Sequence, residues 1–136
     1  MPTPTAVWPV LTFRDALAAT EFLEEAFGFE RAAVYTLDDD PTVVEHAQLN
    51  WPLGGGVMFS TAGKDDTPFG RRAPGNDLVY VVCTDPDGLL ERAVGAGATV
   101  VRGLADEDYG SRGFTVQDPE GNLWSFGTYP GEVGPT

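Results

Sequence analysis

Apolar residues recur at helical spacing in two segments of the chain, separated mostly by charged or small residues. The first segment contains FLEEAFG and the second LLERAVG, which match in pattern and end on the same residue type, glycine. The spacing predicts helices over residues 16–27 and 86–95, with Asp15 and Asp85 as their N-caps. The repeated pattern indicates two copies of one structural unit.

Apolar and polar residues alternate on both sides of each helical segment, as in strands that bury one face. One such strand precedes each helix and several follow it. The expected strands span residues 7–13, 30–36, 43–51 and 56–60 in the first half, and 77–83, 98–102, 111–117 and 122–128 in the second. The order βαβββ therefore occurs twice, which predicts an α+β fold.

The segment AGKDDTPFGRRAPGN, residues 62–76, separates the two copies. Gly, Pro and charged residues without periodicity are typical of a connector. We expect a single domain over residues 1–136, with one βαβββ module at about residues 6–61 and the other at about residues 77–129. Helices on one side of each sheet leave the other side free to curve into a cup.

The stretch FTVQDPEGNLWSFGTY predicts a hairpin, because DPEG has Asp, Pro and Gly where a type I turn favours them. Alternation puts Trp124 and Phe126 on one face of the last strand and Ser125 on the other. The aromatic face is the expected core face, and Phe22 and Leu89 of the helices are expected to be buried there too. Ser125 is therefore expected to face away from the core.

Charge and composition restrict the partners of the protein. A formal net charge of −13 argues against nucleic acid and anionic membranes, which would repel the chain, and leaves a cationic ligand open. The apolar runs are too short to span a membrane, and MPTPTAVWPV lacks the features of a signal peptide, so a cytoplasmic protein is expected. The single cysteine, Cys83, lies in the apolar run LVYVVCTD and is expected to be buried and inert.

Three longer motifs carry a family resemblance: TFRDALAATEFLEEAFGFE, TDPDGLLERAVGAGATVV and YGSRGFTVQDPEGNLWSFGTY. In these motifs and their order the chain resembles the vicinal oxygen chelate superfamily, which includes glyoxalase I, the bleomycin resistance proteins and the extradiol dioxygenases. The resemblance covers residues 6–129 approximately. It implies paired βαβββ modules that form a cupped mixed sheet around a ligand, in most members within a homodimer.

The resemblance also implies four metal-ligand positions, which fall on Trp8, His46, Leu78 and Ser125 of this sequence. Divalent metals need several nitrogen or oxygen donors that converge on one point. Only His46 is a good ligand among the four, and Ser125 stands where metal-dependent members have their last glutamate. We therefore expect neither a metal nor another cofactor.

The side chains expected to face the cup mix apolar and polar groups, as sites for organic ligands do. The expected ligand-binding residues are Trp8, His46, Gln48, Asn50, Leu78, Tyr80, Thr115, Gln117 and Ser125. No catalytic residue is assigned with them. His46 is the one candidate acid or base, and its neighbour Glu45 points to the opposite strand face. Tyr109 and Arg112, in EDYGSRG, are further candidates for the rim of the cup.

These observations favour a metal-independent binding protein of the bleomycin-resistance type, a homodimer that sequesters a small, partly aromatic compound, with a cationic compound as an option. The alternative is a small metal-independent lyase or isomerase that uses His46 as acid or base. A third reading is a domain whose cup is vestigial. The sequence does not identify the ligand or the arrangement of the dimer.

Overall fold

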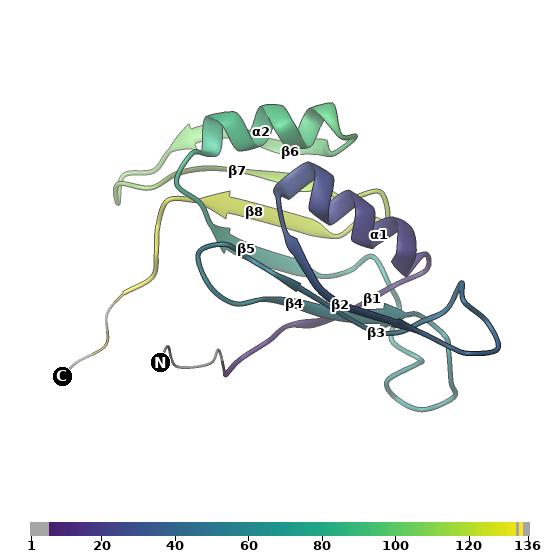
Figure 1. Cartoon of the computed structure of the whole chain (residues 1–136). Helices are drawn as coiled ribbons and strands as arrows, with labels where there is room; N and C mark the ends of the chain where they lie inside the picture. The colour runs from purple at the N-terminus through teal and green to yellow at the C-terminus, as the bar shows by residue number, and fades with distance from the viewer. Residues whose placement is uncertain (1–5, 133, 135–136) are drawn as a thin grey trace.

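The computed structural model describes residues 6–132 and residue 134, which form two four-stranded mixed sheets with helices (Figure 1). The first sheet has the strand order β1-β4-β3-β2 and the second β5-β8-β7-β6. In each sheet the first strand of the module runs parallel to its last strand, and the other pairs are antiparallel. This confirms the predicted α+β fold of two βαβββ modules.

The elements follow the predicted order closely. The first module contains β1 (Val10–Phe13), α1 (Ala16–Phe22), η1 (Leu23–Phe27), β2 (Glu30–Thr36), β3 (Val44–Asn50) and β4 (Gly56–Thr61). The second contains β5 (Leu78–Val82), α2 (Pro86–Gly95), β6 (Thr99–Asp106), β7 (Arg112–Gln117) and β8 (Leu123–Gly127). The first predicted helix is present, but its second half, η1, is a π-helix. β1 begins later than predicted, so that Trp8 precedes the strand.

Both predicted N-caps are present. The carboxylate of Asp15 accepts a hydrogen bond from the backbone nitrogen of Ala18, and that of Asp85 accepts one from Gly88, each at 3.1 Å. These bonds satisfy amide groups that have no partner inside a helix. Each helix therefore begins directly after the aspartate that caps it.

The buried carboxylate of Asp118 organises the turn between β7 and β8. It accepts hydrogen bonds from the backbone nitrogens of Glu120 (2.9 Å) and Asn122 (3.0 Å). The Asn122 side-chain amide and the Trp124 indole nitrogen also donate to it, each at 3.0 Å. The predicted hairpin is confirmed, and its geometry directs Trp124 to the core and leaves Ser125 on the opposite face of β8.

One hydrophobic core lies on the helix-facing sides of both sheets. Trp124 and Phe126 are 0% and 1% exposed, and the ring of Phe27 from η1 packs against them with centroid distances of 5.4 and 4.7 Å. The predicted burial of Trp124 and Phe126 is confirmed. Phe22 and Leu89, predicted to be buried as well, are only partly buried, because they pack against the margin of this core.

Two polar links fix the modules against each other. The Glu120 carboxylate, from the second module, accepts hydrogen bonds from the backbone nitrogens of Arg14 (2.6 Å) and Asp15 (2.9 Å). In the other direction, the Arg92 guanidinium of α2 donates to the carbonyl oxygens of Glu25 (2.8 Å) and Glu24 (3.1 Å) in η1. The two helical segments therefore lie side by side (Figure 1).

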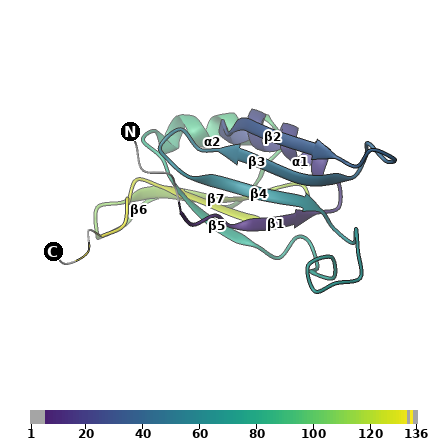
Figure 2. The same cartoon turned by 60° about the horizontal axis from the view of Figure 1, so that its bottom comes forward.

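Because the helix-facing sides of both sheets contact one shared core, their other sides face outward. We call these the first open face, on β1 to β4, and the second open face, on β5 to β8. Figure 2 looks onto the first sheet, with the helices behind it. Within a single chain, the two open faces thus belong to different parts of the surface.

Cys83 directly follows β5 and is 5% exposed, as expected. Burial, with a smaller contribution from the charge of Asp85, raises the pKa of this thiol to about 11. No helix among the described residues is long and apolar enough to cross a membrane.

Candidate functional site

A row of four side chains crosses the middle of the second open face. Strand register pairs Tyr80 with Ser125, Ser125 with Thr115, and Thr115 with Arg102. The hydroxyl oxygens of Thr115 and Ser125 lie 2.7 Å apart, so one hydroxyl donates to the other. The accepting hydroxyl keeps its own proton, which leaves the pair one donor for a ligand.

This row lines a hollow of about 160 Å³. Its lining residues all belong to the second module and include Ser111 and Gly113. Arg102 and Glu107 form an ion pair there. The hollow therefore offers hydroxyl groups, a paired cation and anion, and the backbone of a glycine.

Tyr80 stands beside this hollow with its ring held in one place. Its hydroxyl donates a hydrogen bond to the carbonyl oxygen of Tyr129 at 2.7 Å, and the side chain remains 48% exposed. A Cβ at position 127 would lie 2.8 Å from this hydroxyl, so Gly127 makes room for the ring. Partial burial raises the pKa of Tyr80 above its usual value near 10. Leu78, on the same face, is 64% exposed.

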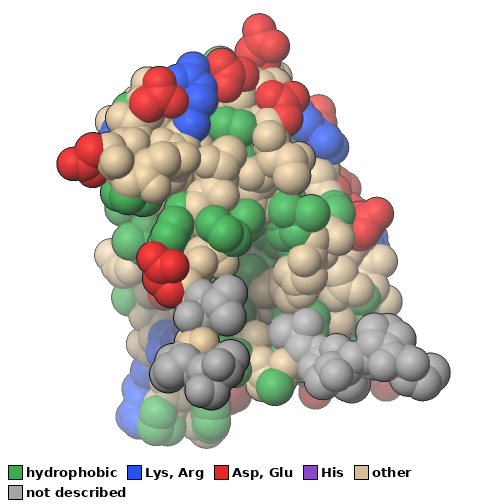
Figure 3. Space-filling view, turned by 90° about the vertical axis from the view of Figure 1, so that its left-hand side faces the viewer, with side chains coloured by type: hydrophobic (Ala, Val, Ile, Leu, Met, Phe, Trp, Pro, Cys, Tyr) green, Lys and Arg blue, Asp and Glu red, His purple; other side chains and the backbone are tan. Residues whose placement is uncertain are grey.

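A second hollow of about 390 Å³ adjoins the first, since Tyr80 and Tyr109 line both. Tyr129 adds a third aromatic side chain to its lining, beside Val82 and Pro130, and the rings of Tyr109 and Tyr129 meet edge to face at a centroid distance of 5.5 Å. Figure 3 shows the side of the molecule that lies at the left of Figure 1, where hydrophobic side chains gather around a depression. Sequence reasoning missed Tyr129, which lies beyond the predicted strand 122–128, and Ser111, which was the first residue of the predicted strand 111–117 but was not assigned to the cup.

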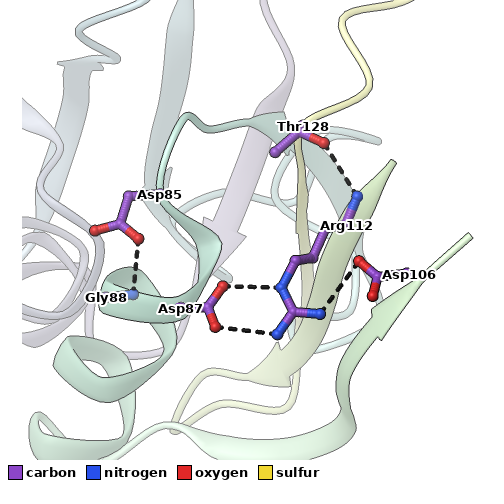
Figure 4. Close-up of polar contacts among 6 residues, drawn as sticks. All are labelled: Asp85, Asp87, Gly88, Asp106, Arg112 and Thr128. Carbon is purple, nitrogen blue, oxygen red and sulfur yellow. Dashed lines mark hydrogen bonds and ion pairs between the residues drawn. The ribbon is translucent and has the colours of Figure 1, made fainter. Parts of the chain in front are cut away.

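The loop that carries Tyr109 is clamped at both of its ends (Figure 4). The guanidinium of Arg112 binds both carboxylate oxygens of Asp87 on α2, at 2.9 and 3.0 Å, and pairs with Asp106 at 3.2 Å. The backbone nitrogen of Arg112 also donates to the Thr128 hydroxyl at 3.0 Å. Arg112, a candidate for the rim of the cup, thus lies toward α2 and supports the loop instead of lining either hollow.

The first open face carries the other predicted residues. Gln48 donates from its side-chain amide to that of Asn50 at 2.9 Å, and both are partly buried. The exposed His46 stacks on Tyr35 with a centroid distance of 6.4 Å. Within the described part of the chain, His46 forms no hydrogen bond to a carboxylate, so the orienting partner that a catalytic histidine needs is not supplied there.

The structure thus divides the predicted ligand-binding residues into two groups. Five lie on the second open face: Leu78, Tyr80, Thr115, Gln117 and Ser125. Three lie on the first: His46, Gln48 and Asn50. Trp8, predicted to lie on a strand of the cup, is half-buried ahead of β1. We call the two groups half-sites, because a single chain does not bring them together.

The four family metal positions lack the donor groups of a metal centre. Trp8 and Leu78 offer no donor for a divalent metal, and the neutral hydroxyl of Ser125 is already paired with Thr115. His46 lies on the other open face. Among the described residues, no group of three or more His, Cys, Asp or Glu side chains is placed to hold a metal ion. The residues present do not fit the metal centre of this family.

Comparison with known proteins gives relatives in sequence and structure. An uncharacterised protein of Mycobacterium bovis (strain ATCC BAA-935 / AF2122/97) is 32% identical over 94% of this chain and 86% of its own. The crystal structure of TioX from Micromonospora sp. ML1 has a TM-score of 0.74 and 31% identity, covering 90% of this chain and 98% of its own. A Sphaerobacter thermophilus structure, at 20% identity and TM-score 0.65, covers 90% and 97% and shows the same fold.

The family model also matches most of the chain. It spans residues 5–126, which contain both half-sites and all but the end of β8. The second Mycobacterium relative, from M. tuberculosis (strain ATCC 25618 / H37Rv), is likewise 32% identical over 94% of this chain and 76% of its own. Sequence, fold and family model agree: the chain belongs to the Glyoxalase/Bleomycin resistance protein/Dioxygenase superfamily.

Proposed function

We propose that this protein binds a small, partly aromatic molecule without a metal, in a site that a second copy of the chain completes. The observation that carries the proposal is the exposure of Leu78 (64%) and Tyr80 (48%) on the same open face as the Thr115–Ser125 hydroxyl pair. Apolar surface next to a few fixed polar groups is the composition of sites for organic ligands. Large apolar side chains on a sheet face also favour burial by a partner.

The two half-sites are the reason to expect a second copy. If the first open face of one copy lies over the second open face of another, Gln48 and Asn50 come opposite Thr115 and Ser125. The exposed Val10 (52%) on β1 would be covered at the same time. A two-fold axis makes this arrangement twice in one dimer, which gives two identical sites.

Side chains already occupy the free edges of the strands nearest to the proposed contact. Arg72 donates from Nη2 to the carbonyl oxygen of Val10 on β1 at 2.6 Å. The indole nitrogen of Trp51 donates to the carbonyl oxygen of Val82 on β5 at 2.8 Å. Since these bonds satisfy edge carbonyls that another strand would use, we expect the copies to meet through their faces rather than by extending a sheet.

Catalysis by His46 is not part of the proposal. The imidazole is exposed, stacks on Tyr35, and lies on the other face from the hydroxyl pair. A general acid or base needs a positioned partner and a substrate within hydrogen-bond reach. We therefore assign no catalytic residue.

The test combines sedimentation equilibrium with a thermal-shift screen of metabolites and drug-like compounds. We expect twice the chain mass of 14.5 kDa, and at least one compound that raises Tm because it binds only the folded state. Ser125→Trp, which fills the smaller hollow, should abolish that shift, and Glu91→Gln on the exposed side of α2 should not. A monomer that no compound stabilises would contradict the proposal.

A further inference from the structure

We propose that the hollow formed by Tyr80, Tyr109 and Tyr129 is the subsite for a planar aromatic cation. This inference rests on the proposed binding function and names the chemical class of its ligand. It concerns Tyr109 and Tyr129 in particular, which lie outside the strand faces from which the half-sites were defined.

Three aromatic side chains from separate parts of the second module converge on this hollow. Tyr80 lies on β5, Tyr109 in the loop before β7, and Tyr129 after the end of β8. All three line the hollow of about 390 Å³, which lies in the size range of small-molecule sites. Tyrosine rings offer flat apolar faces on which a planar ligand stacks.

The Tyr80 ring and the backbone at Tyr129 are held before any ligand arrives. The Tyr80 hydroxyl donates to the Tyr129 carbonyl at 2.7 Å, and the Tyr129 backbone nitrogen donates to the Ser111 hydroxyl at 3.2 Å. The Tyr109 loop is closed by a hydrogen bond from the Glu107 nitrogen to the Ser111 carbonyl at 2.7 Å. A preformed wall loses little conformational entropy on binding, which favours affinity.

Two of the three tyrosines remain open to solvent. Tyr80 is 48% exposed and Tyr109 is 64% exposed, although each is fixed in a hydrogen-bonded segment. A cation over a tyrosine face is attracted by the negative face of the ring. Exposed, ordered ring faces are therefore suited to a ligand that is both flat and positively charged.

The charge of the segment before Tyr109, and of the whole chain, favours a cationic ligand. Asp106, Glu107 and Asp108 directly precede Tyr109 in the chain. Arg102 pairs with Glu107, and Arg112 pairs with Asp106 while it also binds Asp87. Among the described residues the lining of the tyrosine hollow is itself uncharged, whereas the segment before Tyr109 is acidic and the whole chain carries −13. This field attracts cations and repels anions.

The adjoining smaller hollow adds a polar contact. Its Thr115–Ser125 pair keeps one hydroxyl donor, and Tyr80 stands between the two hollows. A ligand whose ring stacks in the tyrosine hollow would therefore reach this donor with an acceptor group. The inferred ligand class is a planar aromatic cation that carries a hydrogen-bond acceptor.

The experiment compares two probes of equal charge. One is 1-methylquinolinium, which is planar and aromatic, and the other is N,N-dimethyldecahydroquinolinium, which is saturated. Both are titrated into the full-length protein, and binding is measured by calorimetry and by ligand-observed NMR. We expect the aromatic probe to bind about tenfold more tightly than the saturated one, as a cation–π contribution of moderate size requires.

Matched variants locate the binding. Tyr109→Leu keeps apolar volume and removes the ring, and should weaken 1-methylquinolinium binding by about tenfold. Tyr109→Phe should retain binding. The control is Phe69→Leu, which removes a 77% exposed ring from the connector and should change nothing. Melting curves and sedimentation of each variant show whether fold and assembly are retained.

Three results would overturn the inference: no binding of either probe, equal binding of both, or unchanged binding in Tyr109→Leu. None of them bears on the thermal-shift screen or on the dimer, which are measured without these probes. Failure of this ligand class is thus distinguishable from failure of the proposed function.

Discussion

The hydroxyl oxygens of Thr115 and Ser125 lie 2.7 Å apart in the middle of the second open face. By the family resemblance, Ser125 stands where metal-dependent members of the superfamily have their last glutamate. In this structure Ser125 is one member of a neutral hydrogen-bonded pair. The pair presents one donor to the hollow and carries no charge. Ser125 is therefore suited to orient an organic ligand rather than to hold a metal ion.

Restoring the carboxylate should not create a metal centre. We expect the wild-type protein to hold less than one equivalent of divalent metal after dialysis with zinc, nickel or manganese, and Ser125→Glu to behave alike. The variant gains one donor, whereas catalytic zinc sites use three protein ligands. It should also be slightly less stable, because a partly buried carboxylate loses hydration. Elemental analysis is the readout, and a full equivalent in the wild type would contradict the account.

Asp118 should be important for stability, since its carboxylate accepts hydrogen bonds from Glu120, Asn122 and Trp124. Asp118→Ala removes the acceptor and leaves buried donors unpaired. We expect a loss of about 3 kcal/mol in the free energy of unfolding, measured by urea denaturation. Asp108→Ala, at an exposed loop position, should change it by less than about 0.5 kcal/mol. Equal effects would show that the Asp118 network does not hold the hairpin.

Cys83 should react slowly with thiol reagents and make stability depend on pH in the alkaline range. Burial raises its pKa from 9.0 to about 11, so between these values the folded state keeps a proton that the unfolded state loses. The contribution of Cys83 to the free energy of unfolding is complete below pH 9 and is lost as pH rises toward 11. Native protein should alkylate with iodoacetamide far more slowly at pH 8 than unfolded protein, and Cys83→Ala should flatten the stability curve above pH 9. Rapid native alkylation would contradict this.

The clamp around Arg112 should control the loop that carries Tyr109. Arg112→Ala removes the contacts to Asp87 and Asp106 that hold the segment before β7. We expect faster hydrogen exchange at the backbone amides of Glu107 and Gly110, both of which are hydrogen-bonded within the loop, and little change in β3. Arg31→Ala, which removes the ion pair with Glu24 in the first module, serves for comparison. Unchanged exchange in the loop would show that Arg112 does not position it.

Asp87 should keep this clamp intact in mildly acidic solution. Hydrogen bonds from Arg112 hold the pKa of the Asp87 carboxyl below its usual value of 3.8. Because the pKa is lowered, the contribution of Asp87 to stability is present above pH 3.8. It is lost as pH falls through the folded-state pKa. An NMR titration of the Asp87 carboxyl carbon should therefore have its midpoint below 3.8, and a midpoint above it would contradict the pairing.

Local sequence patterns were sufficient to predict the two modules and the direction of the side chains on β8. Strand alternation predicted that Trp124 would be buried and that Ser125 would face away, because side-chain direction in a strand depends only on the parity of the position. The N-caps Asp15 and Asp85 could be predicted for a similar reason, since the bond that each makes lies within a few residues.

Features that depend on contacts between distant residues were not predictable. The separation of the half-sites follows from the packing of the modules, which Glu120 and Arg92 fix through bonds to backbone atoms far away in the sequence. No periodicity encodes such bonds. Tyr129 joins the tyrosine hollow because of the path of the chain after β8, and Trp8 lies outside β1 because that strand begins later than its apolar pattern suggests.

The most direct test of the central claim is a paramagnetic relaxation measurement between two copies of the chain. One copy carries Cys83→Ala and a spin label at Gln48→Cys, and the other is isotope-labelled and carries only Cys83→Ala. If the first open face of one copy covers the second open face of the other, the amide signals of Thr115 and Ser125 should lose intensity in the mixture. A label at Glu91→Cys should leave both signals unchanged. Undiminished Thr115 and Ser125 signals with the Gln48 label, in a sample that sediments as a dimer, would contradict a site completed by the second copy.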